Sequence, residues 1–350
     1  MAVEFLDTSL RELTTIRVGG GADRIIRVTT EPELVELVSE CSHLASPTLI
    51  VGGGSNVVCS DQYFPGTVIV VATTGIEWGE STVRVSAGEN WDSFVQQAVE
   101  RGYGAFTPLS GIPGSVGATP IQNIGAYGME IADVIHRVTV LDRETLYQME
   151  LEPADCDFGY RTSVFKRTPQ RYVVLGVTFT LLPTTVIDVV YPQLAEIMGV
   201  AVGDTVDAQA VRESVLALRG AKSMVLDSAD ADSNSTGSFF INPTVPHNMA
   251  PEGCPSYALK AHDPRVSTHV KLSAAWLIEQ AGITKGFRLG ESDVRVSANH
   301  SLAIANTDSG TAAQVLELAG HMRQRVFDAW GIELEVEPVL LNCSVSELVR

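Results

Sequence analysis

Residues 111–128 read GIPGSVGATPIQNIGAYG, and this stretch decides the expected fold. It holds five glycines and two prolines, and no Asp, Glu, Lys or Arg occurs anywhere in residues 102–129. Such a composition makes a poor helix and a poor strand. One interpretation is a buried irregular connection. We favour a backbone cradle around a flat, phosphate-bearing cofactor, because long irregular segments in compact domains usually have a function.

A second glycine cluster lies nearer the N-terminus, where GGGSNVV at 52–58 follows the short apolar run TLIV. Backbone N–H groups of consecutive small residues can converge on a phosphate. A tight turn that needs positive φ explains such a cluster about as often. The cluster lacks the GxGxxG spacing and the lysine of a P-loop, so the sequence indicates neither a standard Rossmann site nor an NTPase.

The segments around these clusters alternate in type. Residues 1–74 read as a small βαβ-like domain, with a helix expected at 30–41 where Thr30 and Glu33 have capping-box spacing. Residues 75–210 hold several strand-like apolar runs around one short helix. The pattern therefore predicts a second domain that is richer in strands.

The C-terminal third of the chain predicts a mixed α/β domain over 211–330. Helical periodicity occurs at 270–281 and 311–330. The last apolar run, IELEVEPVLL at 332–341, could return to the sheet of the second domain. The polar stretch DSADADSNST at 227–236 holds too few apolar residues to pack, and we expect a mobile loop there.

Composition limits the classes of protein. The chain has 350 residues, of which 45% are hydrophobic, so two or three domains are expected. A net charge of −18 argues against nucleic acid and anionic membranes as partners. Five widely spaced cysteines without a CxxC pair indicate neither a disulfide framework nor a zinc site, and they fit a reducing cytosol. We expect no signal peptide, no membrane helix and no required metal.

Four strings together carry a family resemblance: VGGGSNVV at 51–58, SGIPGSVGATPIQNIGAYG at 110–128, FGYRTSVFK at 158–166 and GSFFINP at 237–243. They resemble the signatures of the UDP-N-acetylenolpyruvoylglucosamine reductase family. The match extends over nearly the whole chain in the same order. Agreement of four separate strings is specific, whereas any one of them could occur by chance.

The resemblance implies a fold and a division into domains. The fold would be α+β, with a two-part FAD-binding fold of the vanillyl-alcohol-oxidase type and a third, mixed α/β substrate-binding domain. The first part of the FAD-binding fold would be residues 1–74. The second part would be residues 75–210 joined by 331–350, and the substrate-binding domain would be 211–330.

The resemblance also implies a reaction. In the family, NADPH reduces non-covalently bound FAD and leaves, and UDP-N-acetylglucosamine enolpyruvate then enters the same space. Hydride passes to the methylene carbon of the enolpyruvyl group and a proton is added at the neighbouring carbon, which gives UDP-N-acetylmuramate. This small molecule would be the partner. From the charge and the cysteines we expect no nucleic acid or membrane partner and a cytoplasmic protein, and from the lack of a heptad or a large apolar stripe we expect a monomer.

Three residues match the family's catalytic positions. Arg161 matches the arginine that stabilises negative charge developing on the substrate, as hydride addition requires. Ser238 matches the serine that donates the proton. Glu337 matches the C-terminal carboxylate, with Glu335 as the alternative two residues earlier. At this point the chain departs from many relatives, because Val339 replaces an arginine that follows the catalytic glutamate.

His300 receives no role in the chemistry. The remaining family positions fall into two sets. The FAD-binding set is Gly52, Gly53, Gly54, Ser55, Asn56, Ile112, Pro113, Gly114, Ser115, Gly117, Ala118, Ile121, Gly125 and Arg219. The substrate-binding set is Gln122, Tyr127, Tyr160, Tyr191, Lys222 and Asn242. Of these, Tyr191 could equally be a core-packing tyrosine.

Three alternative functions stay open on the sequence. The first is an FAD-dependent oxidase of the same broad fold that acts on an alcohol or a lactone. The second is a non-catalytic nucleotide-binding homologue, against which the joint presence of Arg161, Ser238 and a C-terminal glutamate argues. The third is a metal-dependent transferase or phosphatase, and the chain has no HxxxH or DxDxDG pattern that would support it.

Overall fold

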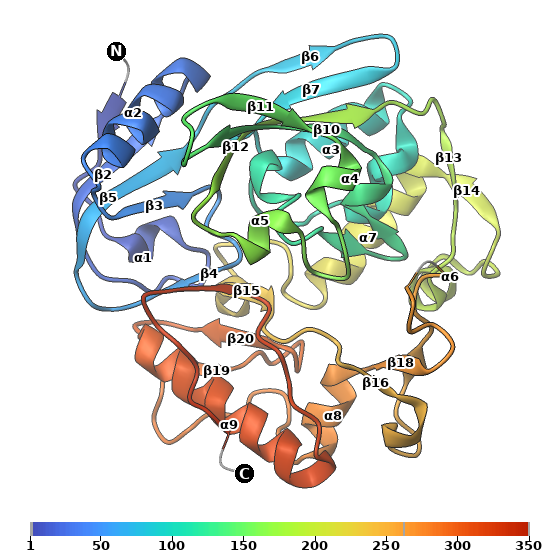
Figure 1. Cartoon of the computed structure of the whole chain (residues 1–350). Helices are drawn as coiled ribbons and strands as arrows, with labels where there is room; N and C mark the ends of the chain where they lie inside the picture. The colour runs from blue at the N-terminus through green and yellow to red at the C-terminus, as the bar shows by residue number, and fades with distance from the viewer. Residues whose placement is uncertain (1–2, 262, 349–350) are drawn as a thin grey trace. The chain divides into compact units, whose positions relative to one another are not determined.

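The computed structural model describes residues 3–261 and 263–348. Helices and strands are mixed along the chain, so the fold is α+β as predicted (Figure 1). The chain forms two compact units, each described by itself below. Unit 1 consists of the segment that ends at Thr8 together with Ala22–Gly54 and Phe64–Val225. Unit 2 consists of Ser9–Gly21, Ser55–Tyr63 and the chain from Leu226 onward.

The first sheet of unit 1 has four strands in the order β1-β2-β5-β3. Their bounds are Val3–Phe5, Ala22–Val28, Phe64–Val71 and Thr48–Val51. The strands β2 and β3 run parallel to β5, and β1 is antiparallel to β2. Helix α2, Glu31–His43, lies against this sheet in Figure 1 and buries Leu34, Leu37 and Val38. The predicted helix at 30–41 is confirmed, and the Thr30 hydroxyl donates to the Glu33 carboxylate at 2.8 Å.

The second sheet of unit 1 has five antiparallel strands in the order β11-β10-β12-β7-β6. Their bounds are Gln148–Leu151, Ile135–Asp142, Tyr172–Thr180, Thr82–Ser86 and Ile76–Trp78. Helix α3, Trp91–Glu100, begins after Asn90, whose side chain accepts from the Ser93 N–H. Phe94, Phe106 and Phe179 pack ring against ring with Trp91 in the core. The strand-rich character predicted for 75–210 is confirmed.

The uncharged segment 102–129 is irregular and largely buried, as its composition predicts. It contains only short elements: the 3₁₀ turns η1 at Gly104–Leu109 and η2 at Val116–Ala118, and the short strands β8 at Gly125–Ala126 and β9 at Met129–Glu130. Thr107 and Ser110 are fully buried, and each hydroxyl donates to a backbone carbonyl within the turn. These two buried hydroxyls are therefore satisfied by backbone carbonyls of the segment itself.

Two helices and a two-stranded antiparallel sheet form a small core of their own in unit 1. The strands are β13 at Val186–Asp188 and β14 at Thr205–Asp207, and the helices are α6 at Pro192–Met198 and α7 at Ala208–Gly220. The short helices α4, Pro153–Cys156, and α5, Val164–Arg167, also belong to unit 1. Asp207 caps α7 by accepting from the Ala210 N–H at 3.1 Å. One face of α7 carries Arg212 and Arg219, both buried.

Unit 2 combines two three-stranded sheets with a helical layer. The strand orders are β15-β20-β19 and β16-β18-β17, and β21 pairs with β4. The bounds are Ser235–Ser238, Ala303–Asn306, Val294–Val296, Thr244–Pro246, His269–Leu272, Ser256–Tyr257, Val339–Leu341 and Val57–Cys59. The helices are α1 at Leu10–Leu13, α8 at Ala274–Gln280 and α9 at Ala312–Trp330. Figure 1 shows α9 in red beside β19 and β20, and α8 in orange next to α9.

Helix α9 confirms the prediction for 311–330 in detail. Thr311 and Gln314 form a reciprocal capping box at its start, and Gly331 ends it in the left-handed conformation. The first helical N–H groups, those of Ala312 and Ala313, donate to the carboxylate of Asp61 at 2.9 and 3.0 Å. A residue from the N-terminal part of the chain thus completes a helix near the C-terminus.

Two predictions for the helices and strands of the C-terminal third are wrong. Residues 270–272 belong to strand β18, in which buried Val270 and Leu272 alternate with half-buried positions, and α8 begins only after Ser273. The run at 332–341 does not return to the five-stranded sheet, since β21 pairs in parallel with β4. Val339–Leu341 is therefore not a strand of the five-stranded sheet, while the proposed division into three domains stays a prediction.

The acidic stretch at 227–236 is anchored, contrary to the mobile loop expected from its composition. Asp232 is 4% exposed, and its carboxylate accepts hydrogen bonds from Arg295 at 3.0 Å and from the Ala298 N–H at 3.0 Å. A buried ion pair with an added backbone hydrogen bond holds its partners in one arrangement. Composition could not reveal this anchor, because the arginine lies 63 positions further along the chain.

The five cysteines are all free thiols. Burial raises the pKa of Cys59 to about 12, that of Cys156 to about 12 and that of Cys343 to about 11, so these thiols stay protonated at neutral pH. Among the described residues, no helix combines the length and the apolar character that crossing a bilayer requires.

Candidate functional site

The two glycine motifs of the sequence meet backbone to backbone in unit 1. A Cβ at Gly53 would lie 2.6 Å from the Cα of Gly114, and a Cβ at Gly52 would lie 2.4 Å from the Ser115 hydroxyl oxygen. Side chains at these positions would force the two segments apart. Close packing of backbone without side chains is what a cradle for a phosphate-bearing cofactor requires.

The rest of the cradle is held by close packing and short hydrogen bonds. A Cβ at Gly117 would lie 2.6 Å from the Ala87 Cβ, and the Ile121 carbonyl accepts from the buried Ser163 hydroxyl at 2.5 Å. Gly54 has φ of +62°. The remaining members of this set differ in exposure: Ile112, Pro113 and Gly125 are half-buried, and Ala118 is exposed.

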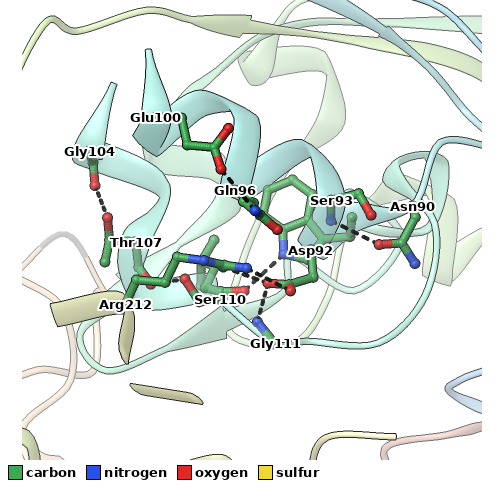
Figure 2. A network of polar contacts seen from close by, with 12 residues as sticks. Asn90, Asp92, Ser93, Gln96, Glu100, Gly104, Thr107, Ser110, Gly111 and Arg212 are labelled. Carbon is green, nitrogen blue, oxygen red and sulfur yellow. Dashed lines mark hydrogen bonds and ion pairs between the residues drawn. The ribbon is translucent and has the colours of Figure 1, made fainter. Parts of the chain in front are cut away.

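A charged network that the sequence did not reveal contacts the glycine segment at Gly111. Figure 2 shows the Asp92 carboxylate between the Arg212 guanidinium and the Gly111 N–H. The two arginine nitrogens donate at 2.7 and 2.8 Å, and the Gly111 N–H donates at 2.6 Å. Nothing in the sequence indicated the pair, because Asp92 and Arg212 are 120 positions apart.

Arg219 has the one feature of unit 1 that points most directly to a bound anion. The side chain is 7% exposed, and one of its terminal nitrogens donates to the Met224 carbonyl at 3.0 Å. Its Nε has no hydrogen-bond partner among the described residues. Burial lowers the pKa of Arg219, which the charges of Tyr127 and Asp92 oppose. A buried cation with an unmatched donor suits the phosphate or carbonyl oxygen of a flavin cofactor.

Arg161 lies against the uncharged segment rather than in solvent. Its guanidinium donates to the Gly125 carbonyl, approaches the Asn123 carbonyl at 3.5 Å and lies 5.3 Å from the centre of the Tyr160 ring. Its backbone is left-handed, with φ of +54°. Asn123, which sequence reasoning missed, is buried, and its amide nitrogen donates to the Gly159 carbonyl at 3.0 Å. The FGYR motif is thus fixed to the glycine segment.

Part of the predicted substrate set gathers on the small core of α6 and α7. The rings of Tyr127 and Tyr191 meet edge to face at 5.4 Å, and the Lys222 ammonium donates to the Gln193 side chain at 2.8 Å. Burial raises the pKa of Tyr127, and the positive charge of Arg219 opposes the shift. Tyr191 packs against this core, so its packing role is real whether or not it also binds substrate. Gln122 and Tyr160 are half-buried in unit 1.

Unit 2 places the candidate serine and glutamate on adjacent backbone segments. Phe240 and Val336 form an antiparallel bridge, and the Glu337 N–H donates to the Phe239 carbonyl at 2.9 Å. Ser238 pairs with Ala303 at the end of β15. The GSFFINP segment and the segment that carries Glu337 are therefore paired through their backbones.

Side-chain exposure distinguishes the two glutamates, whereas their backbone contacts do not. The Ile241 N–H donates to the Glu335 carbonyl at 3.0 Å, so both acids are tied to the serine-bearing segment through their backbones. Their side chains differ, because Glu335 is exposed whereas Glu337 is partly buried. Partial burial favours Glu337 as the acid of a site.

The remaining candidates of unit 2 lie close to these segments along the backbone. The Asn56 carbonyl accepts from the Val339 N–H at 2.9 Å, which ties the end of GGGSN to the strand that follows Glu337. The Thr15 hydroxyl donates to the Ser235 carbonyl at 2.6 Å and lies 3.5 Å from the Ser55 carbonyl. The Asn242 side chain accepts from the Ala274 N–H at 2.9 Å and so caps α8.

A metal site is not formed by the described part of the chain. Over residues 3–261 and 263–348, His, Cys, Asp and Glu side chains nowhere gather in a group of three that could hold a metal ion. The donors that the structure does gather are backbone N–H groups and arginine side chains, which suit anionic oxygen ligands.

Comparison with known proteins agrees with this geometry. Residues 22–145 match the family model described as FAD binding domain, and residues 229–341 match that of the UDP-N-acetylenolpyruvoylglucosamine reductase C-terminal domain. A protein of Cutibacterium acnes with the name UDP-N-acetylenolpyruvoylglucosamine reductase is 44% identical over 346 residues, which cover 97% of this chain and 90% of the relative. The namesake of Streptomyces avermitilis is 42% identical, with coverage of 97% and 95%.

A solved structure resembles the fold. The crystal structure of UDP-N-acetylenolpyruvylglucosamine reductase from Thermus caldophilus superimposes with a TM-score of 0.67 and 24% identity, over 97% of this chain and 99% of that one. The similarity extends through both compact units, so the fold as a whole is shared with that protein.

Proposed function

Because this chain belongs to the UDP-N-acetylenolpyruvoylglucosamine reductase family, we propose that its FAD takes electrons from NADPH and that Arg161, Ser238 and Glu337 carry the reduction of UDP-N-acetylglucosamine enolpyruvate. The chain is a flavoprotein oxidoreductase of peptidoglycan precursor synthesis. The alternative of an alcohol or lactone oxidase is not favoured, since the matched C-terminal domain includes the GSFFINP motif and the terminal acid.

The observation that carries the cofactor assignment is the buried, unmatched Nε of Arg219 beside a cradle that only glycine permits. FAD supplies a hydride carrier between the nicotinamide and the substrate. We propose that Gly53, Gly114 and Ser115 hold its phosphates through backbone and hydroxyl groups, while Arg219 donates to an oxygen of the cofactor. Tight backbone packing orients these donors before the cofactor binds, which lowers the cost of binding.

Three side chains then act on the substrate. Arg161 offers a fixed positive charge for the carboxylate on which negative charge grows during hydride addition. Ser238 donates the proton to the carbon next to the methylene group, and Glu337 assists by moving a proton at that end of the substrate. The backbone hydrogen bond between Glu337 and Phe239 supports this pairing of a serine and an acid. Tyr191 and Lys222 are proposed to bind the diphosphate.

The test of this function is anaerobic NADPH oxidation by the purified protein, with and without UDP-N-acetylglucosamine enolpyruvate. We expect oxidation that depends on this substrate and yields UDP-N-acetylmuramate by mass spectrometry. A yellow protein that ignores the substrate but, once reduced, reacts rapidly with oxygen would indicate the oxidase instead. If the protein oxidises NADH in the presence of the substrate but does not oxidise NADPH, only the choice of reductant is overturned.

We also propose that the enzyme is a cytoplasmic monomer that serves cell-wall growth, and through it cell shape and division. Five free cysteines support a reducing compartment, since oxidising compartments favour disulfides. Light scattering at several protein concentrations tests the monomer, and a molar mass above 37.5 kDa that persists on dilution would contradict it.

A glycine substitution tests the cradle. Replacing Gly53 with alanine places a Cβ 2.6 Å from the Cα of Gly114, so two backbone segments must separate. We expect FAD affinity to fall about 10- to 100-fold, because overpacking of this kind costs on the order of 1–3 kcal/mol. Fluorescence titration of the apoprotein with FAD measures the change. Gly320→Ala is the control, since its Cβ meets nothing closer than 3.6 Å, and equal effects of the two variants would refute the cradle.

A pair of glutamate substitutions tests the terminal acid. Glu337→Gln is expected to lower turnover about 100-fold or more, as loss of a proton-transfer group does. Glu335→Gln should change turnover less than about twofold, because exposed side chains remote from the chemistry contribute little. Both residues keep their backbone bonds to the serine-bearing segment, so each variant controls for the other. Steady-state kinetics at saturating NADPH decide, and a larger loss in the Glu335 variant would exchange the two assignments.

A further inference from the structure

The first turn of α3 holds the loop at 109–115 by three successive contacts. The Trp91 indole N–H donates to the Leu109 carbonyl at 2.9 Å, and the Trp91 backbone N–H donates to the Gly114 carbonyl at 3.1 Å. Between these two anchors, the Asp92 carboxylate accepts from the Gly111 N–H at 2.6 Å. Among these anchors, only Asp92 uses a charged side chain, and the loop that it fixes leads directly into the cradle.

On this basis we propose that Asp92 and Arg212 are positioning residues for FAD: Asp92 fixes the cofactor loop through the Gly111 N–H, and Arg212 holds Asp92 in place. The proposal rests on the proposed function, because it takes FAD as the ligand of the cradle. Neither residue needs to touch the cofactor. Their effect passes through the backbone from Gly111 to Gly114 and Ser115.

The geometry of the pair is that of a structural clamp. Arg212 reaches Asp92 with both terminal nitrogens, a bidentate arrangement that restricts the carboxylate in position and in rotation. The Arg212 side chain is 6% exposed and that of Asp92 is 32% exposed, so water competes weakly for the arginine. The clamp connects α3 to α7 across the start of the loop (Figure 2).

At Gly111 both the backbone conformation and the available space suit glycine. Its φ is +70°, and a Cβ there would lie 2.7 Å from the Leu216 Cδ2 and 3.4 Å from the Arg219 Nε. The residue is confined between α7 on one side and Asp92 on the other. Because Gly114 and Ser115 follow within four residues, a shift at Gly111 moves the atoms that contact Gly53 and Gly52.

The clamp also separates the roles of two arginines on one helix. Arg212 and Arg219 lie two turns apart on the buried face of α7. Burial alone would raise the pKa of Asp92, but the hydrogen bonds from Arg212 and the Gly111 N–H, with the charges of Arg212 and Arg219, lower it below the ordinary value. Asp92 thereby compensates Arg212 and leaves the Nε of Arg219 available for an acceptor.

A second carboxylate of unit 1 provides a matched control. Asp142 is 2% exposed, accepts from Arg171 at 3.1 and 3.2 Å and accepts from the Glu144 N–H at 2.8 Å. It therefore makes the same kinds of bond as Asp92. It lies at the turn between β10 and β11 instead of beside the cradle, so it reports what loss of such a clamp does to stability alone.

The experiment compares Asp92→Ala, Asp92→Asn and Asp142→Ala as apoproteins. FAD dissociation constants come from quenching of cofactor fluorescence, and urea unfolding gives the stability of each variant. We expect Asp92→Ala to weaken FAD binding about 10- to 100-fold, since a charged hydrogen-bond partner is lost. Asp142→Ala should destabilise the protein similarly yet leave FAD affinity within about twofold. The Asp92→Asn variant keeps an acceptor for the Gly111 N–H and should fall between wild type and Asp92→Ala.

Two further measurements separate the possible failures. Hydrogen exchange of the wild-type apoprotein and of Asp92→Ala should show lost protection at 109–115 only in the variant, and turnover at saturating FAD should be nearly restored. Equal FAD affinities for Asp92→Ala and Asp142→Ala, or unchanged exchange at 109–115, would overturn the positioning role. Failure of wild-type protein to bind FAD would instead overturn the proposed function, while the exchange result would still test the clamp. If Asp92→Ala does not fold, Asp92→Asn carries the same comparison.

Discussion

Replacing Ser238 with alanine is expected to lower turnover by about 10²- to 10⁴-fold, because the reaction then lacks its proton donor. Reduction of the enzyme by NADPH should proceed at the wild-type rate, since no proton from Ser238 is needed there. Stopped-flow measurement of the two half-reactions separates these effects: the loss of yellow colour with NADPH stays fast, and its return on addition of the enolpyruvyl substrate becomes slow.

Two variants make the serine result decisive. Ser238→Cys keeps a proton on the side chain and should recover part of the activity, whereas Ser256→Ala removes an exposed hydroxyl in the same unit and should have no effect. A slow first half-reaction in Ser238→Ala would mean that the substitution disturbs the cofactor. If the second half-reaction of Ser238→Ala keeps the wild-type rate, the proton comes from another group.

Replacing Arg161 with glutamine is expected to lower kcat by about 10²- to 10³-fold, as the loss of a preorganised charge at a reacting centre does. The guanidinium also donates to the Gly125 carbonyl, so the substitution removes a contact to the glycine segment. The flavin absorption spectrum and the FAD dissociation constant must therefore be measured beside kcat and KM. We expect both to stay near wild type while kcat falls.

The neighbouring Arg167 supplies the control for Arg161. It belongs to the same short segment but forms an exposed ion pair with Asp157. Arg167→Gln should keep full turnover, because exposed ion pairs contribute little, and Arg161→Lys should restore a part of it. If Arg161→Gln loses FAD in proportion to its activity, the arginine is structural and the charge at the substrate must come from elsewhere.

Much of the fold was predictable where local rules decide. The capping box at Thr311 and the terminating Gly331 delimit α9 from sequence alone, and the uncharged residues 102–129 are irregular as their glycines and prolines require. The errors occurred where distant residues decide. Residues 270–272 became a strand because β16 and β17 pair with them, and residues 339–341 pair with a strand from the start of the chain.

The residues of the candidate site likewise divide into those that local sequence predicts and those that only the tertiary fold brings together. The glycine motifs, Arg161 and Ser238 were identified from strings that resemble a family, and the structure joins Gly53 to Gly114 within one cradle. Asp92 and Arg212 could not be found so, since no local pattern marks an ion pair between residues 120 positions apart. Buried polar partners are chosen by the tertiary fold, which one sequence does not encode in any short window.

The pairing of β4 with β21 has a consequence for synthesis of the protein. Val57–Cys59 leaves the ribosome long before its partner Val339–Leu341 has been synthesised. Asp61 likewise has no helix to cap until the start of α9 has been synthesised. These contacts of unit 2 therefore form late in synthesis, and contacts of such long range slow folding. Until then β4 is an unpaired apolar edge, and chaperones that shield such edges would raise the yield of active enzyme.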